Sequence, residues 1–212
     1  MGRGFFLVLE GPEGSGKTTL AQALLARMRE DGVDVMAVRE PGGTPVAEAL
    51  RSELLDAARP WTAEAELLYM VTARSDLVTR VIRPALERGT TVVSDRFDLS
   101  TLAYQGAGRG LPLEQVKWVN AAATGGLVPG LTLVLDLDPA EGRQRQALMG
   151  KGADRLEREP VAFHERVAAA YRDAHGPGVF HLDAHSSPGR VLASAWALCV
   201  AARPETFHPR PE

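Results

Sequence analysis

A glycine-rich segment near the amino terminus holds the first residues whose types and spacing could do chemistry. Its pattern is G-x-x-x-x-G-K-[ST], and its members are Gly11, Pro12, Glu13, Gly14, Ser15, Gly16, Lys17 and Thr18, with Thr19 following. An apolar run precedes it and a helical pattern follows, as a phosphate-binding loop requires. Its N–H groups and the positive helix end attract an anion. We therefore expect a nucleoside triphosphate here, with Lys17 reaching the β- and γ-phosphates and Thr18 offering its hydroxyl to Mg²⁺.

Glu13 is unexpected in such a loop, because a carboxylate repels a polyphosphate. Either the loop does not bind phosphate, or Glu13 faces something else.

Two predicted strands end in an aspartate that could support the metal through water. These are Asp95 in "TVVSDR" and Asp136 in "LTLVLDLD". We favour Asp95, because Arg96 follows it and sets a phosphate-binding guanidinium beside a metal-facing carboxylate. The alternative is an Asp–Arg pair that only caps a strand end.

A basic segment at about 140–158 follows a helix-start signature, Asp138 and Pro139. It predicts a lid that closes on a transferring phosphoryl group and excludes water. A solvated basic helix is the alternative. The cations, placed around Gly150 and Gly152, are Arg143, Arg145, Lys151, Arg155 and Arg158.

Five short apolar runs must position these residues: "FFLVLE", "VDVMAVRE", "TTVVSD", "LTLVLDLD" and "GVFHLD". They alternate with amphipathic stretches, which indicates an α/β fold with a parallel sheet covered by helices on both faces. Ligands of such sheets bind beyond the carboxyl ends of the strands. We expect one domain over residues 1–212, a loop at "GAGRG" and a frayed tail at about 203–212.

Composition narrows the function classes. The formal charge of -3 offers no general basic face for a nucleic acid, and no apolar run approaches the ~20 residues of a membrane span. Cys199 stands alone in an apolar helical run, which favours core packing. His181 and His185 read as strand then loop, which argues against zinc binding. We expect a cytoplasmic protein that binds neither nucleic acid nor membrane.

Taken in order, "EGPEGSGKTT", "REPGGT", "DRFDLSTLAYQGAGRG", "LVLDLDP" and "DRLERE" resemble the bacterial thymidylate kinase family. The resemblance runs from about Phe5 to Val191 and is carried more by the later motifs than by the phosphate-binding loop. It implies a three-layer P-loop kinase fold with a five-stranded parallel sheet and a small basic lid. It also implies phosphoryl transfer from ATP, with Mg²⁺, to dTMP, and a homodimer built on the long third helix.

The same resemblance assigns an acceptor site. It implies that Glu13 holds the sugar 3′-hydroxyl of dTMP while the loop backbone holds ATP. Arg74 corresponds to a position that contacts the thymine carbonyl, and Met70 shares its helix face through i, i+4 spacing. The Tyr104 position crowds a ribose 2′-hydroxyl and so favours deoxyribose. The other implied acceptor residues are Arg39, Pro41, Arg96, Thr101 and Gln105.

Two positions depart from the family pattern. Met70 stands where a stacking Phe is usual, and Asp76 replaces a common Gln. Because methionine is a less rigid platform for a base than an aromatic ring, we expect looser discrimination between dTMP and dUMP.

The expected mechanism needs no strong general base, because the acceptor phosphate is already anionic. Lys17 would hold the donor and Arg96 the acceptor phosphate. Some relatives carry Arg at the position of Gly14, and the resemblance implies that chains without it keep the catalytic cation in the lid. The candidates are Arg143, Arg145, Lys151 and Arg155, of which Arg155 in "DRLE" matches the family pattern best.

Two rival functions stay open. One is a P-loop kinase for another nucleotide or for a deoxynucleoside, with Glu13 as base. The other is a nucleotide-dependent switch, against which stands the lack of an Asn-Lys-x-Asp guanine signature.

Overall fold

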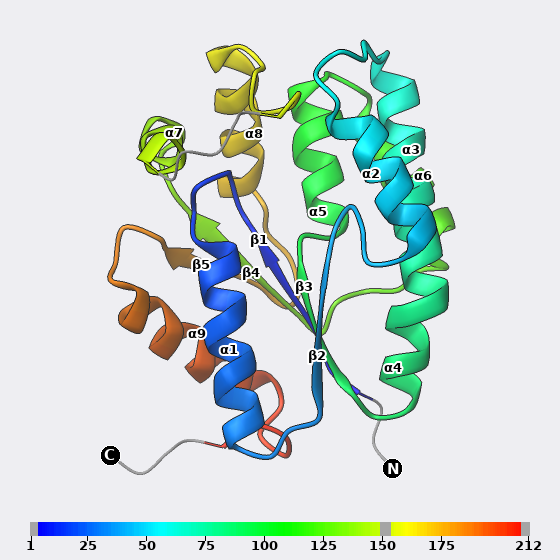
Figure 1. The fold of residues 1–212 in the computed structure, drawn as a ribbon. Helices are drawn as coiled ribbons and strands as arrows, with labels where there is room; N and C mark the ends of the chain where they lie inside the picture. The colour runs from blue at the N-terminus through cyan, green and yellow to red at the C-terminus, as the bar shows by residue number, and fades with distance from the viewer. Residues whose placement is uncertain (1–3, 149–153, 209–212) are drawn as a thin grey trace.

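The computed structural model describes residues 4–148 and 154–208. At its centre lies a sheet of five parallel strands in the order β2-β3-β1-β4-β5 (Figure 1). All five predicted runs become strands, which confirms the predicted fold. Because β1 lies between β3 and β4, the segments that follow these strands meet at one edge of the sheet. The strands are β1 (Phe6–Glu10), β2 (Val35–Arg39), β3 (Thr91–Asp95), β4 (Leu131–Asp136) and β5 (Val179–Asp183).

Helices cover both faces of the sheet (Figure 1). One face packs against α1 (Lys17–Glu30) and α9 (Pro188–Ala202). The opposite face packs against a longer set: the end of α3 (Ala63–Leu77), the π-helix η1 (Val78–Ile82), α4 (Arg83–Glu87), the π-helix η2 (Leu102–Gly108) and α8 (Val161–Arg172). The remaining helices are α2 (Pro45–Leu55), α5 (Asp98–Thr101), α6 (Leu113–Thr124) and α7 (Pro139–Leu148).

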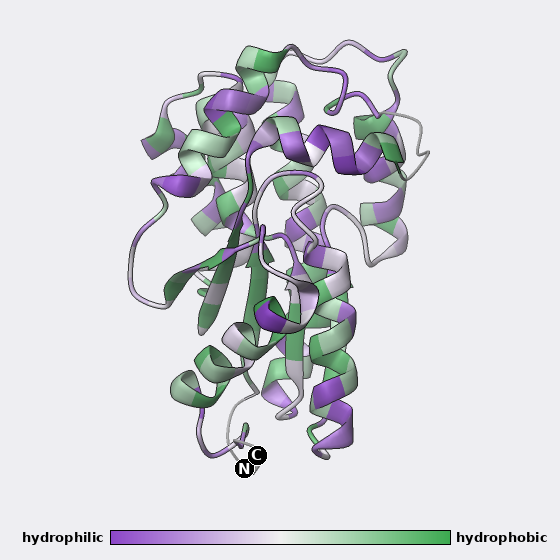
Figure 2. Ribbon diagram, turned by 90° about the vertical axis from the view of Figure 1, so that its left-hand side faces the viewer, coloured by the Kyte–Doolittle hydropathy of each residue, from purple (hydrophilic) through white to green (hydrophobic). Residues whose placement is uncertain are grey.

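Alternation along β1 explains the two cores. Leu7 and Leu9 point into the cluster that contains Leu24 of α1, whereas Phe6 and Val8 point into the cluster that contains Ile82 of η1. Successive side chains of a strand face opposite sides, so both faces of this central strand are buried. The strands are correspondingly hydrophobic along their length (Figure 2).

The expected loop at "GAGRG" is wrong in its first part. Residues up to Gly108 continue the helical turns of η2, and the chain turns only afterwards. A Cβ at Gly108 would lie 2.6 Å from Cε2 of Phe163. The absence of a side chain there allows α8 to approach η2 closely, so this glycine serves packing rather than a flexible loop.

The expected frayed tail is also wrong over residues 203–208. Phe207 is 0% exposed and packs edge-on against Phe5 and Trp196, while the indole N–H of Trp196 donates to the carbonyl of His208 at 3.1 Å. An aromatic side chain in a proline-rich stretch anchors this part of the chain. Residues 209–212 lie outside the described part.

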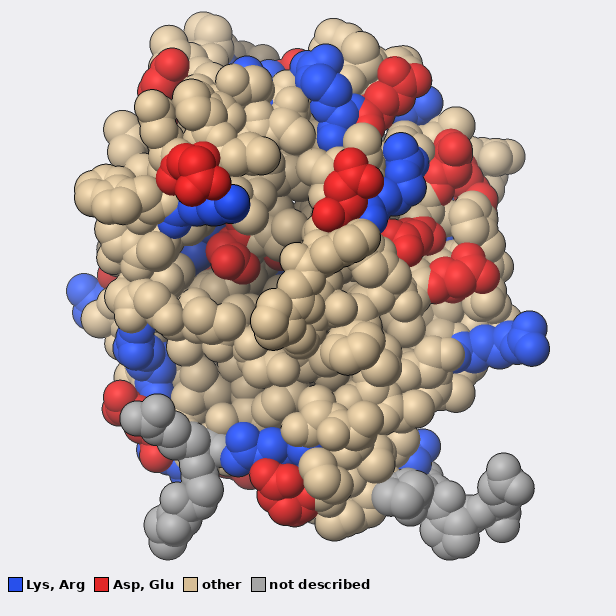
Figure 3. Space-filling model, turned by 180° about the vertical axis from the view of Figure 1, so that it is seen from behind, with Lys and Arg blue, Asp and Glu red and all other residues tan. Residues whose placement is uncertain are grey.

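Two further expectations concern a membrane-spanning helix and a general basic face. Among the described residues, no helix combines the length and the apolar character needed to cross a membrane. On the face shown in Figure 3, acidic and basic side chains lie in small mixed groups around a broad uncharged area.

Candidate functional site

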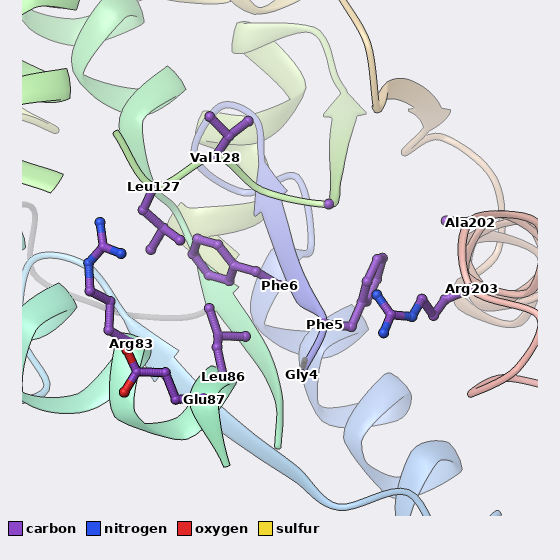
Figure 4. Close-up of a pocket in the computed structure, with 11 residues that line it drawn as sticks. Gly4, Phe5, Phe6, Arg83, Leu86, Glu87, Leu127, Val128, Ala202 and Arg203 are labelled. Carbon is purple, nitrogen blue, oxygen red and sulfur yellow. The ribbon is translucent and has the colours of Figure 1, made fainter. Parts of the chain in front are cut away.

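A cleft of about 570 Å³ opens beyond the carboxyl ends of β1, β2 and β3. It gathers most of the predicted site residues from segments far apart in sequence. Those lining it are Glu13, Gly14, Gly16, Lys17, Thr18, Thr19, Arg39, Pro41, Met70, Asp95, Arg96, Tyr104 and Gln105. A second cavity of about 470 Å³ lies at the amino ends of β1 and β4, between Phe6, Leu127 and Arg83 (Figure 4). It contains no residue of the glycine-rich loop, so the first cleft is the candidate site.

The glycine-rich loop has the backbone of an anion cradle. Gly11, Gly14 and Gly16 have φ of 135°, 73° and 91°, values that residues with a side chain rarely adopt. No side chain caps the start of α1 at Gly16, so its first N–H groups stay available for an anion.

The ammonium group of Lys17 lies against the glycine-rich loop. Its Nζ donates to the carbonyls of Gly11 at 2.9 Å and Pro12 at 2.8 Å. Burial, with repulsion from Arg96, lowers the pKa of Lys17 to about 7. A phosphate placed here would favour the charged ammonium again.

Thr18 and Asp95 supply the oxygens that a magnesium site needs. The Thr18 hydroxyl donates to Oδ2 of Asp95 at 2.9 Å, and both residues line the cleft. Mg²⁺ is usually held by one or two protein oxygens together with phosphates and waters, so this pair fits it. Asp136, the alternative, contacts His181 Nδ1 at 2.9 Å instead.

Glu13 does not direct its contacts toward the loop. Its Oε1 accepts a hydrogen bond from the Tyr104 hydroxyl at 2.7 Å and lies 3.6 Å from Nη2 of Arg96. Its Oε2 lies 3.8 Å from Nδ1 of His164. The carboxylate thus meets groups from η2, α8 and the end of β3. Its place in a phosphate-binding loop is explained by these partners, which hold it toward another part of the cleft.

Arg96 is held in an unusual backbone conformation. Its φ is 77°, the one positive value at a non-glycine position among the described residues. Its Nη1 donates to Tyr171 Oη at 3.0 Å, and its guanidinium lies 5.1 Å from the centre of the Tyr104 ring. A strained backbone conformation persists only where the surrounding residues fix it. Here the surrounding residues hold the charged guanidinium of Arg96 at the cleft.

Glu10 organises the segment after Arg96 and was missed from sequence. It is 0% exposed, and its carboxylate accepts from the backbone N–H of Phe97 and Ser100 and from the hydroxyls of Ser100 and Tyr171. Burial raises the pKa of Glu10. The one available signal was a glutamate ending an otherwise apolar strand, which also reads as an ordinary strand end.

Two predicted acceptor residues lie beneath the cleft instead of lining it. Arg74 is 1% exposed; it donates to Glu40 at 2.6 Å, and also to Thr101, Asn120 and the carbonyl of Phe97. Thr101 is 0% exposed. The guanidinium of Arg74 is thus held by the segment around Phe97 and by helix α6, and its contact with a thymine carbonyl stays a prediction.

Met70 and Gln105 do line the cleft. Met70 is 7% exposed and Gln105 is 0% exposed. The amide Nε2 of Gln105 donates to Oε1 of Glu66 at 2.8 Å, while its Oε1 is buried without a partner in the described structure.

Beside Gly42 and Gly43 of the "REPGGT" segment, Arg39 forms two hydrogen bonds of 2.9 Å with the carboxylate of Glu48. Arg51 donates to the carbonyl of Pro41 at 2.9 Å and lines the cleft. Burial lowers the pKa of Arg51, and Arg39 adds repulsion. Sequence reasoning missed Arg51, because one arginine in an amphipathic helix gives no distinguishing signal.

Three catalytic candidates of the predicted lid, Arg143, Arg145 and Arg155, have different surroundings. Arg143 keeps a buried Nη1 without a partner in the described structure, and it lines a small recess with Pro12 and Glu13. Arg145 donates to Glu141 at 2.5 Å and to the Ala184 carbonyl at 3.0 Å.

Arg155, the favoured catalytic candidate, docks elsewhere in this structure. Its Nε donates to the carbonyl of Leu54 at 2.7 Å, and its Nη2 lies 2.7 Å from Oε2 of Glu66. Its contacts are thus with α2 and α3 rather than with the glycine-rich loop. Lys151 and the lid glycines lie outside the described residues.

The chain is similar to known proteins over most of its length. The sequence profile of the family described as "Thymidylate kinase" matches residues 9–194. The chain is 47% identical over 205 residues to the thymidylate kinase of Deinococcus radiodurans, covering 97% of this chain and 92% of that protein. It is 43% identical over 211 residues to that of Lactobacillus delbrueckii subsp. bulgaricus, covering 97% and 100%. The crystal structure of thymidylate kinase from Ehrlichia chaffeensis superposes with a TM-score of 0.75 at 27% identity, over 93% of this chain and 99% of that chain.

Proposed function

Because the chain belongs to the thymidylate kinase family, it transfers the γ-phosphoryl group of ATP to dTMP for dTTP synthesis, and we propose how its own residues do so. The observation that carries the proposal is the convergence of Lys17, Arg96 and Glu13 on one cleft. Lys17 and Arg96 supply two cations for phosphate groups, and Glu13 supplies a hydrogen-bond acceptor.

ATP binds along the glycine-rich loop from Gly11 to Thr19. Backbone N–H groups and the uncapped start of α1 receive its phosphates, and Lys17 leaves its carbonyl partners for the β- and γ-phosphates. Thr18 and Asp95 would hold Mg²⁺. When bound, Mg²⁺ neutralises charge on the phosphate oxygens.

dTMP binds on the other side of the cleft. Glu13 accepts a hydrogen bond from the 3′-hydroxyl, held in place by Tyr104. Met70 covers the base, Gln105 meets its edge, and Arg96 holds the 5′-phosphate. Arg39 and Pro41 close the pocket. Arg74 and Thr101, which hydrogen-bond to each other beneath the cleft, support the residues that line it.

Catalysis comes from alignment and charge neutralisation. The acceptor phosphate is already largely ionised at neutral pH, so no residue needs to remove a proton from it. Among the lid arginines we favour Arg143 over Arg155 for contact with the transferring phosphoryl group. Arg143 lines a recess with Pro12 and Glu13 of the glycine-rich loop, whereas Arg155 contacts Leu54 and Glu66, and this difference in location supports the choice. Arg145 is the second candidate.

We also propose a homodimer through α3 and α6. Leu68 of α3 is 56% exposed and Trp118 of α6 is 73% exposed, and large apolar side chains left in water on neighbouring helices are typical of an interface. Light scattering coupled to size exclusion tests this directly. We also propose a cytoplasmic location, because the reaction consumes ATP and dTMP.

The function is tested by ADP release from Mg·ATP with dTMP, dUMP, UMP, dGMP, dCMP and thymidine offered separately. We expect strong dependence on dTMP and none on thymidine. Preference for another monophosphate would require a new acceptor assignment for Met70 and Gln105. Turnover without any acceptor would contradict the kinase mechanism.

A further inference from the structure

The side-chain amide of Gln105 is oriented by a buried neighbour, Glu66. Gln105 is 0% exposed, and its Nε2 donates to Oε1 of Glu66 at 2.8 Å. Its Oε1 is buried and has no partner in the described structure, although the residue lines the same cleft as Met70. A buried carbonyl oxygen without a donor is costly. A group on the ligand can supply the missing donor.

Glu66 allows one orientation of this amide. It is 1% exposed, receives two hydrogen bonds from Arg109, of 3.1 and 2.9 Å, and lies 2.7 Å from Nη2 of Arg155. Although burial by itself would raise the pKa of Glu66, hydrogen bonds from Arg109 and Gln105 lower it below its ordinary value. The carboxylate is therefore ionised and can only accept hydrogen bonds. The amide must turn its NH₂ group to Glu66 and its oxygen away from Glu66, and the residue lines the cleft.

We propose that Glu66 is a positioning residue for base selection, which holds the Gln105 amide so that the cleft presents an acceptor to the edge of the acceptor base. Thymine and uracil carry a donor, N3–H, on that edge. Cytosine carries a lone pair on the same ring nitrogen and would face the oxygen of Gln105 without a hydrogen bond. The inference rests on the proposed placement of the base beside Met70 and Gln105.

The test is Glu66→Gln, with kcat/KM measured for dTMP, dUMP and dCMP. Glutamine has the shape of glutamate but can donate, so it lets the Gln105 amide turn over. We expect the dTMP-to-dCMP ratio to fall about 10- to 100-fold, because a site built around a hydrogen bond strongly rejects a base that cannot make it. The dTMP-to-dUMP ratio should stay within about twofold, since both bases carry N3–H. A general loss of packing would not separate these two ratios.

Glu159→Gln is the matched control. Glu159 pairs with Arg109 at 2.6 Å and so belongs to the same charge network, yet it is Glu66 that binds the amide of Gln105. Both ratios should stay at the wild-type values in Glu159→Gln. An equal fall of the dTMP-to-dCMP ratio in Glu159→Gln and Glu66→Gln would overturn the inference.

Gln105→Leu separates this inference from the base placement on which it rests. If Gln105→Leu lowers the dTMP-to-dCMP ratio and Glu66→Gln does not, the placement stands and the role of Glu66 is overturned. An unchanged ratio in Gln105→Leu would overturn both. If Glu66→Gln does not fold, the side-chain amide resonances of wild-type Gln105 decide: they should remain protected from exchange when dTMP binds, and loss of protection would overturn the inference.

Discussion

The hydroxyl of Tyr104 donates a hydrogen bond to the Glu13 carboxylate at 2.7 Å, and this contact ties the phosphate-binding loop to the acceptor side of the cleft. Tyr104 is 5% exposed, so its ring cannot move without disturbing the packing against Phe163 and Tyr171. A carboxylate fixed in this way repels phosphate from its own position and attracts a neutral hydroxyl. One residue can thus keep the donor chain and the acceptor sugar apart.

Glu13→Ala should weaken dTMP much more than ATP. Loss of a hydrogen bond to a charged group costs about 1.5–3 kcal/mol, or about 10- to 100-fold in the KM for dTMP, while the KM for ATP should change by less than about threefold. Steady-state kinetics with each substrate varied in turn measures both constants. Tyr104→Phe, which keeps the carboxylate but removes the hydroxyl, should have a smaller effect. Equal losses for dTMP and ATP in Glu13→Ala would contradict the assignment.

Met70→Phe should sharpen the preference for dTMP over dUMP. An aromatic ring gives the base a rigid stacking partner worth about 0.5–1.5 kcal/mol beyond its buried area, whereas the methionine side chain has three rotatable bonds. We expect the ratio of kcat/KM values to rise by about two- to tenfold in competition between the two nucleotides. Since Met70 is buried, a melting curve must accompany the kinetics. An unchanged ratio in a folded variant would show that this position does not set base selectivity.

Arg143→Gln should lower kcat more than it raises either KM. An arginine that meets the transferring phosphoryl group contributes on the order of 10³ to 10⁵ in rate, so even partial loss is visible in kcat. Arg145→Gln and Arg155→Gln provide the comparison, because both side chains already have protein partners. Single-turnover rates at saturating ATP and dTMP separate chemistry from binding. If Arg155→Gln has the largest effect, the lid moves Arg155 away from Glu66 during the reaction, and the choice of Arg143 is wrong.

Local patterns predicted the strands and the glycine-rich loop, because strand periodicity and the G-x-x-x-x-G-K-[ST] spacing are set by neighbouring residues. The surroundings of Arg74 could not be read in this way. Its partners Glu40 and Asn120 are 34 and 46 positions away. Glu40 follows β2 and Asn120 lies on α6, so only the tertiary fold brings both to Arg74 on α3. The contacts of Arg155 could not be read for the same reason, since its partner Leu54 lies 101 positions earlier. Motif matching identified both arginines, but tertiary contacts decide which way their guanidinium groups point.

His181 should make the protein more stable at mildly acidic pH than at alkaline pH. Its Nδ1 lies 2.9 Å from Oδ2 of Asp136, and its Nε2 lies 2.8 Å from the carbonyl of Ala174. Both partners can only accept, so the ring must donate from both nitrogens and carry a charge. Burial opposes this, but the Ala174 carbonyl and Asp136 raise the pKa of His181 above 6.5.

A raised pKa stabilises the folded state below the unfolded pKa, and this contribution disappears as pH rises through the folded pKa. His181→Gln should therefore cost about 0.5–1 kcal/mol of unfolding free energy at pH 5.5 and almost nothing at pH 8.5. Urea unfolding at the two pH values measures the difference. Asp136→Asn should reproduce the same pH dependence. A cost for His181→Gln that is equal at both pH values would exclude the charged ring.

Phe207→Ala should destabilise the protein even though the residue lies in a proline-rich tail. Phe207 is 0% exposed, and its ring centre lies 5.5 Å from that of Phe5 and 5.7 Å from that of Trp196. Removing a buried phenylalanine costs about 3–5 kcal/mol through lost transfer energy and the cavity left behind. Phe180→Ala is the control. Because Phe180 is 44% exposed on β5, this substitution should lower the free energy of unfolding much less. Urea unfolding measures both. A loss below about 1 kcal/mol in Phe207→Ala would mean that the tail separates from the core readily, and truncation after Ala202 would then also be tolerated.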